Sequence, residues 1–266
     1  MNHLTYALFG MGNIGRILAA RLKAAGVPGE RLLLCDAEAA RAEAAAAEFG
    51  ARPVTPEDES ACRADVLLLA PPPKAVPGLL RQLAPHLTPT QVVVSFAAAL
   101  PLEKLQALIP GIPLARVMPN APSLVGQGMN PVAWGPAVTP SARERVQFVL
   151  DALGQSLETP DERMNWCVGL TGAAMRSLLP ALEGMTRAGV EAGFAEAEAR
   201  RMAAQVMLGT AALVLETDLS FDEIKSLTPM QTLDEAALAQ TLLEAARAAR
   251  DKTEANQQKL LEMTGL

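Results

Sequence analysis

Six residues near the N-terminus, Gly10-Met11-Gly12-Asn13-Ile14-Gly15, have the types and spacing of a loop that binds a dinucleotide. In such a loop the first glycine permits a tight turn, and the second lets the backbone approach a pyrophosphate. The third allows close packing of helix on strand. The helix that follows presents free N–H groups and partial positive charge to the phosphates. We therefore predict a dinucleotide site here, with an ordinary glycine turn as the alternative.

An acidic residue, Asp36, ends the next predicted strand, roughly 20 residues beyond the loop, where a carboxylate can bind the ribose hydroxyls. The same carboxylate would repel a 2′-phosphate, so the sequence favours NAD(H), with NADP(H) as the alternative. Arg41 is the nearest basic residue that argues for NADP(H). Asp36 also has a second interpretation, as the cap of a helix that begins at Ala37, and the two roles are compatible.

The residues around these motifs predict an α/β fold, a Rossmann-type doubly wound and mostly parallel sheet, because short apolar runs alternate with helical patterns. The predicted strands are Thr5–Phe9, Arg31–Cys35, Asp65–Ala70, Val92–Ser95, Leu114–Val117, Val132–Trp134 and Ser156–Glu158. The predicted helices are Arg16–Ala25, Ala37–Phe49, Leu79–Leu87 and a helix opened by Thr139-Pro140.

From residue 161 onward the sequence carries only helix signals. The predicted helices are Met164–Val168, Ala173–Ala192, Ala195–Glu216 and Leu233–Glu262, with breaks at Gly169, Gly193 and Thr228-Pro229. We therefore predict two domains, a dinucleotide-binding domain over 1–160 and an all-helical domain over 161–266. Ala203, Val206, Leu213 and Val214 lie at helical spacing, which predicts an apolar face that associates with another copy.

Composition excludes several classes of function. The net charge is −6 without a basic stripe, so we expect no nucleic-acid partner. Cys35, Cys62 and Cys167 form no CxxC pair, and the two histidines lack partners, so we expect neither a disulfide framework nor a metal site. The apolar stretches Val66–Ala70 and Val92–Ala99 are too short to span a bilayer. With no signal-peptide pattern, the sequence predicts a cytoplasmic protein without membrane association.

A second informative stretch, Arg116–Met129, follows a predicted strand at the edge where α/β sheets place ligands. Its prolines fix the loop, and Asn120 offers both a hydrogen-bond donor and an acceptor. The alternative is that Asn120 only stabilises a rigid turn.

With these motifs the chain resembles the pyrroline-5-carboxylate reductase family over essentially its full length. The resemblance rests on Gly10–Gly15, Ala64–Ala70, Ser95–Ala99, Arg116–Met129, Ala188–Val190 and Ala203–Thr210. It implies a Rossmann domain followed by a helical dimerisation domain. It also implies NAD(P)H-dependent reduction of the C=N bond of a cyclic imine or imino acid, as in proline biosynthesis. The implied assembly is a homodimer, or a higher oligomer, whose active sites lie between one Rossmann domain and the partner's helices.

The resemblance also implies site residues. The cofactor groove would be lined by Gly10, Met11, Gly12, Asn13, Ile14, Gly15, Asp36, Ala70, Pro71, Pro72, Ser95, Phe96, Ala97, Ala98 and Asn120. The substrate would contact Met118, Pro119, Thr171, Arg176, Gln231 and Thr232, with Thr232 as the catalytic candidate. For Arg176, which is new at its position, the alternative is a surface or interhelical arginine.

Departures from the family pattern fall on the substrate side. Ala70-Pro71-Pro72-Pro73 stands where the family has Ala-Val-Lys-Pro, and Thr171–Arg176 replaces Ser-Gly-Ser-Gly-Pro-Ala. Thr228–Leu233 replaces a Ser-Pro-Gly-Gly-Thr-Thr loop, so Leu233 takes the place of a substrate-binding threonine and Thr232 substitutes for it in part. This loss of donors predicts weak or absent pyrroline-5-carboxylate reduction. The alternative function is therefore a relative that acts on another imine or a carbonyl, or a non-catalytic dinucleotide-binding dimer.

Overall fold

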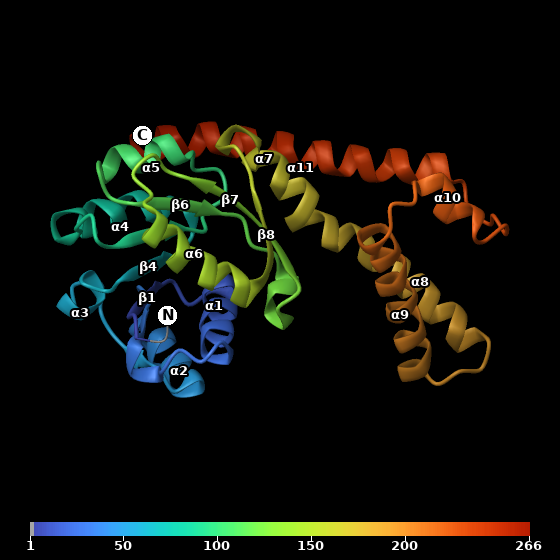
Figure 1. The fold of residues 1–266 in the computed structure, drawn as a ribbon, viewed down its shortest axis with the longest axis horizontal. Coiled ribbons are helices and arrows are strands. Elements are labelled where there is room, and N and C mark those ends of the chain that lie inside the picture. Colours follow the sequence, from blue (N-terminus) through green and yellow to red (C-terminus); the bar gives the residue numbers. More distant parts are fainter. Residues whose placement is uncertain (1–2) are drawn as a thin grey trace. The chain divides into compact units, whose positions relative to one another are not determined.

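The structure, a computed structural model, describes residues 3–266 of the chain. It forms two compact units, the first made of residues up to Gly172 together with Ala246–Leu266, and the second of Ala173–Ala245. The first unit is a sheet with helices and the second is helical (Figure 1). None of the helices within residues 3–266 has the length and apolar character that crossing a membrane requires.

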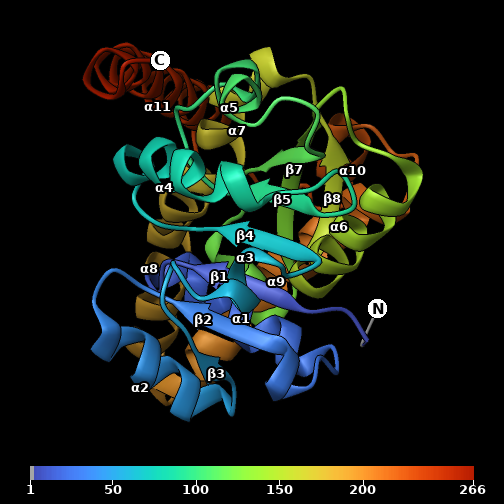
Figure 2. The same cartoon turned by 90° about the vertical axis from the view of Figure 1, so that its left-hand side faces the viewer.

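The sheet contains, among the described residues, eight strands in the order β3-β2-β1-β4-β5-β6-β7-β8 (Figure 2). The strands are β1 (Tyr6–Phe9), β2 (Leu32–Cys35), β3 (Arg52–Pro53), β4 (Val66–Leu69), β5 (Val92–Ser95), β6 (Leu114–Val117), β7 (Gly128–Trp134) and β8 (Gly154–Glu158). Neighbours are parallel except β6 and β7. The chain runs outward from β1 to β2 and β3, then returns to β4 on the other side of β1. Such a reversal of strand order marks the ligand site of doubly wound sheets.

Alternate strand residues build two cores, one on each face of the sheet. On β1, Tyr6 and Leu8 belong to the core that includes residues of α1, α2 and α6, whereas Ala7 and Phe9 belong to the core with residues of α3, α4 and α5. These helices are α1 (Asn13–Ala24), α2 (Ala39–Phe49), α3 (Glu59–Cys62), α4 (Val76–Leu83), α5 (Leu102–Leu108) and α6 (Pro140–Leu153). The alternation explains why β1, β2, β4 and β5 read as nearly continuous apolar runs, since both of their faces are covered.

The first unit contains a buried ion pair. Arg116 on β6 is 1% exposed and donates from Nη1 to Oδ1 of Asp161 at 2.8 Å. The other carboxylate oxygen of Asp161 accepts the N–H of Leu102, at the start of α5, at 2.8 Å. Nε and Nη2 of Arg116 are buried and have no hydrogen-bond partner in the described chain. The carboxylate of Asp161 therefore neutralises the buried charge of Arg116 and connects β6 with α5.

The strands predicted from the sequence are all present, although β7 begins earlier than expected, at Gly128. The predicted break at Gly169 is wrong. A π-helix, Val168–Ala173, continues the chain from α7 (Met164–Cys167) into α8 (Ala174–Glu191). Glycine is needed there for another reason, because a Cβ on Gly169 would lie 2.5 Å from the carbonyl oxygen of Ala246. Close packing of the C-terminal helix α11 (Glu235–Thr264) therefore explains this glycine.

The second unit contains α8, α9 (Glu196–Glu216), α10 (Phe221–Ser226) and the first turns of α11. Helices α8 and α9 form a hairpin that turns at Gly193, where φ is +92°. Gly189 allows the two helices to approach closely, since a Cβ there would lie 2.7 Å from the Cβ of Ala199. The predicted helices and the break at Gly193 are confirmed in this unit.

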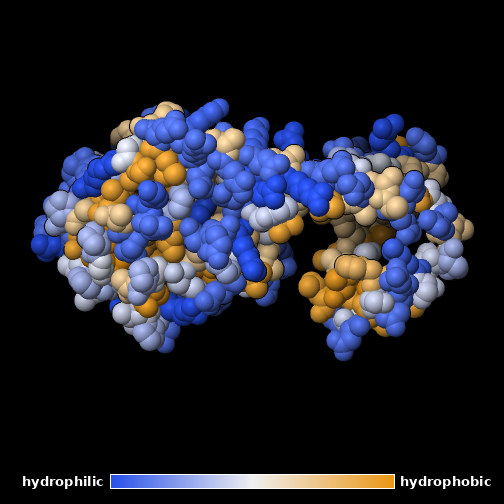
Figure 3. All heavy atoms as spheres, turned by 90° about the horizontal axis from the view of Figure 1, so that it is seen from above, coloured by the Kyte–Doolittle hydropathy of each residue, from blue (hydrophilic) through white to orange (hydrophobic). Residues whose placement is uncertain are grey.

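Most of the second unit's apolar side chains are exposed. Between Ala173 and Ala245, all of which the structure describes, only Ala199 and Ala203 are buried. Ala203 therefore packs inside the hairpin, and its predicted place on the exposed apolar face is wrong. Val206, Leu213 and Val214 are exposed as expected. Figure 3 shows apolar residues on the surface of this unit, at the right of the view.

Candidate functional site

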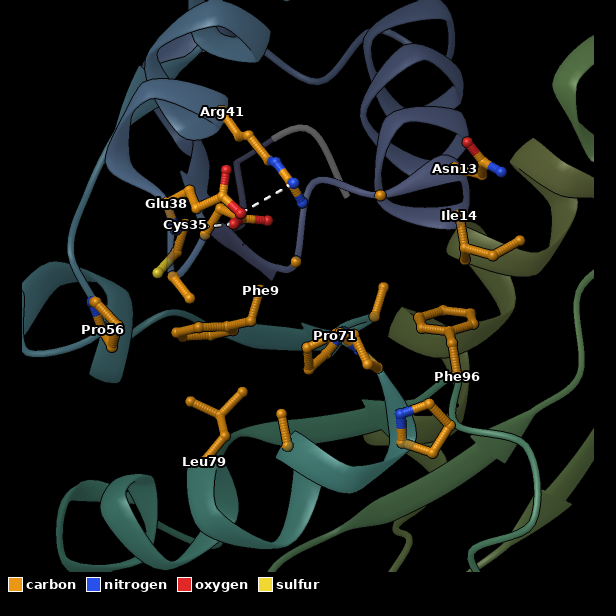
Figure 4. A pocket seen from close by; sticks show the side chains of 18 of the residues that line it. Phe9, Asn13, Ile14, Cys35, Glu38, Arg41, Pro56, Pro71, Leu79 and Phe96 are labelled. Carbon is orange, nitrogen blue, oxygen red and sulfur yellow. Dashed lines mark hydrogen bonds and ion pairs between the residues drawn. The ribbon is translucent and has the colours of Figure 1, made fainter. Parts of the chain in front are cut away.

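A cleft of about 760 Å³ opens at the carboxyl ends of β1, β2 and β4 (Figure 4). The cleft lies where the strand order of the sheet reverses, which is where doubly wound sheets bind ligands. Its volume is within the roughly 300–1,000 Å³ typical of ligand pockets. It is lined by predicted site residues from the loops after β1, β2, β4 and β5, namely Gly10, Gly12, Asn13, Ile14, Asp36, Ala70, Pro71, Pro72, Phe96 and Ala98. The fold thus brings together residues that lie far apart in the sequence.

The three glycines of the first loop have three different surroundings. Gly10 has φ +95°, and a Cβ there would lie 2.5 Å from the backbone nitrogen of Pro71. A Cβ on Gly15 would lie 1.8 Å from the carbonyl oxygen of Gly10. By contrast, outside Gly12 and its two chain neighbours, no heavy atom of the described chain lies within 4 Å of a Cβ built on Gly12, which is the N-cap residue of α1. Gly10 and Gly15 therefore pack closely against backbone atoms, whereas Gly12 leaves free space beside the loop.

Asp36 is fixed at the edge of this cleft by two backbone N–H groups. Met11 donates to Oδ2 at 2.6 Å, and Glu38 donates to Oδ1 at 2.9 Å. Helix α2 begins at Ala39 with Glu38 as its N-cap residue. The proposed role of Asp36 as cap of a helix from Ala37 is therefore wrong. Its carboxylate instead connects the glycine loop to the end of β2 and lines the cleft.

Two further charged side chains lie at the same end of the cleft. Nη2 of Arg41 contacts Oε1 of Glu38 at 2.9 Å, and the two side chains are 57% and 65% exposed. Both residues line the cleft with Asp36, and Figure 4 shows the contact between Glu38 and Arg41. Sequence reasoning missed Glu38, although its spacing of three residues from Arg41 at a helix start is a signal for an ion pair.

The rest of the cleft wall is largely apolar. Phe9, Pro56 and Leu79 line it together with Cys35. Burial raises the pKa of the Cys35 thiol to about 12, and the neighbouring Asp36 carboxylate adds to this increase. Because a neutral thiol is a poor nucleophile, Cys35 acts as an apolar wall residue. Within residues 3–266, no group of three or more His, Cys, Asp or Glu side chains could hold a metal ion.

Several predicted cofactor contacts lie outside the cleft lining. Met11 contributes its backbone N–H to Asp36 while its side chain is buried, and Gly15 packs against Gly10. Ser95 is fully buried, and its Oγ accepts the N–H of Ala97 at 3.4 Å. These residues support the loops that line the cleft.

Asn120 connects elements that are distant in the sequence. Its Nδ2 donates to the carbonyl oxygen of Thr171 at 3.2 Å, and its Oδ1 accepts the N–H of Met129 at 3.2 Å. Met118 and Pro119, just before it, are buried. This arrangement matches the rigid-turn alternative for Asn120, and it holds the π-helical turn that contains Thr171 against the start of β7.

The remaining predicted substrate contacts belong to the second unit. Arg176 lies exposed near the start of α8, and Gln231 and Thr232 lie exposed in the segment between α10 and α11. In the same segment Met230 is 78% exposed and Leu233 is 65% exposed. These bulky side chains therefore face solvent in this chain.

A second cavity, of about 470 Å³, shares Pro72 and Ala98 with the cleft. Lys74 and Lys259 line it, and its described lining contains no carboxylate. Ala99, at its edge, is the one non-glycine residue of the described chain with positive φ, at 60°. The lining is therefore suited to an anionic group next to the cleft.

Both halves of the chain are similar in sequence to known protein families. Residues 5–99 match the family described as "NADP oxidoreductase coenzyme F420-dependent", and residues 161–256 match "Pyrroline-5-carboxylate reductase dimerisation". The pyrroline-5-carboxylate reductase of Pseudomonas aeruginosa is 30% identical over 221 residues, 82% of this chain and 81% of that protein. That of Mycobacterium leprae is 32% identical over 215 residues, 79% of this chain and 73% of that protein.

Solved structures show the same fold. The structure of a pyrroline-5-carboxylate reductase from Coxiella burnetii matches with a TM-score of 0.81 and 20% identity, and the match covers 95% of this chain and 98% of that one. The Plasmodium falciparum pyrroline carboxylate reductase, crystallised with NADP bound, matches with a TM-score of 0.82 and 20% identity, over 96% and 98% of the two chains.

Proposed function

This chain belongs to the pyrroline-5-carboxylate reductase family, and on that premise we propose that it reduces the C=N bond of a cyclic imine or imino acid with a nicotinamide cofactor. The observation that carries the proposal is the cleft, in which the open glycine loop and the tethered Asp36 face one cavity. Residues 1–160 would bind the cofactor, and residues 161–266 would supply substrate contacts and a dimer interface.

The residues of the cleft suit a dinucleotide. Gly12 leaves open space at the N-terminus of α1, whose first N–H groups would bind the pyrophosphate. Asp36 would accept hydrogen bonds from the ribose hydroxyls, and the apolar wall near Leu79 would contact a ring. When bound, the reduced cofactor supplies the hydride, and the protein has to orient the reactants and exclude water.

NADH is the preferred cofactor in this proposal. Both carboxylate oxygens of Asp36 are held by N–H groups, so the negative charge stays at the cleft edge. A carboxylate there accepts from two ribose hydroxyls but repels a 2′-phosphate. NADPH would therefore bind more weakly.

Reduction of a protonated imine makes few demands on acid–base side chains, because the substrate already carries the proton that activates it. The cleft lining contains neither histidine nor lysine, which is compatible with this chemistry. Lys74 and Lys259 of the second cavity would favour a substrate with a carboxylate. We assign Thr232 as a hydroxyl that hydrogen-bonds the substrate, with Arg176 and Gln231 as further contacts from a second copy of the chain.

The second unit supports a homodimer. Its two buried residues, Ala199 and Ala203, form too small a core for an independent fold, while Leu215 and Phe221 are 82% and 70% exposed. A second copy that covers this surface would bury more than the ~2,000 Å² typical of permanent interfaces. Sedimentation at micromolar concentration should give a dimer or a multiple of it, whereas a single species near 28.0 kDa would contradict this part of the proposal.

The function is tested with NADH oxidation over a panel of cyclic imines, with and without a ring carboxylate and including pyrroline-5-carboxylate. We expect turnover with at least one imine, and a Thr232→Val variant should lose about tenfold or more of kcat/KM. Thr228→Val, in the same exposed segment, is the matched control and should stay near wild type.

A second candidate function is that of a dimer that binds the dinucleotide without catalysis. It is favoured by Met230 and Leu233, two large exposed side chains at positions where the family has glycine and threonine. A dimer that binds NADH without turning over any cyclic imine would support this non-catalytic alternative and contradict the proposed reductase.

A further inference from the structure

The end of the cleft that contains Asp36, the proposed ribose-binding residue, also contains an arginine that already forms an ion pair. Arg41 is the only lysine, arginine or histidine in the described lining of the cleft, whereas Asp36 and Glu38 both contribute carboxylates there. The guanidinium of Arg41 contacts the Glu38 carboxylate at 2.9 Å (Figure 4). A planar guanidinium is the side chain best suited to bind a phosphate through two N–H groups. Within the described lining of the cleft, the one basic side chain that could bind a 2′-phosphate is therefore paired with Glu38 at the start of the same helix.

The backbone geometry keeps this pair in place without depending on it. The N–H of Arg41 donates to the carbonyl oxygen of Glu38 at 2.9 Å, and the N–H of Glu38 donates to Asp36 at 2.9 Å. Neither bond involves the Glu38 side chain. Because both side chains are mostly exposed, the ion pair itself adds little to folding stability. Glu38 can thus be changed while the start of α2 and the position of Asp36 are kept.

We propose that Glu38 is a cofactor-specificity residue, which engages Arg41 and places a second negative charge at the site of a 2′-phosphate. This inference rests on the proposed dinucleotide function and extends it. Discrimination against NADPH is shared by two carboxylates with different roles. Asp36 binds the ribose hydroxyls, and Glu38 withholds the guanidinium that would otherwise bind the phosphate.

The test measures the Kd of NADH and NADPH for the full-length protein and for Glu38→Gln, Arg41→Ala and the double variant. In Glu38→Gln, NADPH should bind at least about fivefold more tightly, because one repulsive charge is removed and one guanidinium is released. NADH should change by less than about twofold, and adding Arg41→Ala to Glu38→Gln should remove most of the gain. The gain should also shrink as salt is raised to about 0.5 M.

Glu59→Gln is the matched control, because Glu59 forms a similar exposed ion pair with Arg63 at 2.7 Å but does not line the cleft. It should leave the ratio of the two Kd values unchanged. The proposal is overturned if Glu38→Gln binds both cofactors with wild-type affinities, or if the gain in NADPH affinity persists undiminished in the double variant. Failure of the wild-type protein to bind either cofactor is a different result, which would contradict the proposed function itself.

Discussion

Substitution by alanine should have different effects at Gly15 and Gly12 of the same loop: it should lower stability at Gly15 and NADH affinity at Gly12. In Gly15→Ala the new Cβ would lie 1.8 Å from the Gly10 carbonyl oxygen, a backbone atom that cannot rotate away. We expect a loss of about 3 kcal/mol in the free energy of unfolding, at the upper end of overpacking effects. For a chain of this size this corresponds to a fall in Tm of roughly 6–12 °C.

In Gly12→Ala the fold should be nearly unaffected, because no heavy atom of the described chain beyond residue 12 and its two neighbours lies within 4 Å of the new Cβ. The residue has φ −72°, which alanine adopts readily, so the unfolding free energy should change by less than about 1 kcal/mol. NADH affinity should fall about tenfold or more, or at least about 1.4 kcal/mol, because the methyl group occupies the approach to the pyrophosphate.

The assay combines urea unfolding with a fluorescence titration of NADH for each variant. Gly78→Ala, in α4, is the control, since a Cβ on Gly78 also meets no described atom within 4 Å beyond its chain neighbours and the backbone of its own helix, and Gly78 does not line the cleft. It should keep wild-type affinity and gain up to about 1 kcal/mol of stability. A Gly12→Ala protein that binds NADH as tightly as wild type would refute the placement of the cofactor over this loop.

Three further predictions concern single residues. The wild-type protein should bind NADH at least about tenfold more tightly than NADPH, and Asp36→Ser should narrow or reverse that ratio in a titration, because the carboxylate that repels a 2′-phosphate is lost. Asp161→Ala should lower the unfolding free energy by about 3–5 kcal/mol, since it leaves Arg116 buried without a counter-charge, whereas Glu158→Ala at an exposed pair should lose less than about 1 kcal/mol in the same urea experiment. Ala99→Gly should raise the unfolding free energy by about 0.5–1 kcal/mol because it relieves a positive φ, and an unchanged or lower value would contradict that account.

Strands β1, β2, β4, β5 and β6 could be predicted from the sequence because they are covered on both faces and therefore read as short, largely apolar runs. Strand β3, Arg52–Pro53, gave no such signal, since it is two residues long, exposed and at the sheet edge. The early part of β7 was missed because it carries Asn130, a fully buried polar residue. That asparagine is compensated by hydrogen bonds with Ser123 and with the carbonyl oxygen of Gln155, which only the tertiary structure reveals.

The cleft residues proposed to bind the cofactor were equally accessible to sequence reasoning, because the spacing of the Gly10–Gly15 loop and of Asp36 is local. The pairing of Asn120 with Thr171 could not be predicted, because it depends on a π-helical turn distant in the sequence. The exposed apolar face of the second unit could be predicted from apolar residues at helical spacing. The burial of Ala203 could not, because it depends on the close approach of α8 and α9.

Transfer of deuterium from [4,4-²H₂]NADH, which carries the label on both faces of the dihydronicotinamide, to a cyclic amine product tests the central claim most directly. The protein is incubated with the labelled cofactor and a cyclic imine that it turns over, and the product is analysed by mass spectrometry. We predict one deuterium in the product, at the carbon of the former C=N bond, because the proposed reaction would transfer a hydride from C4 of the nicotinamide to that carbon. Cofactor oxidation that yields unlabelled product, or no reduced amine at all, would contradict the account.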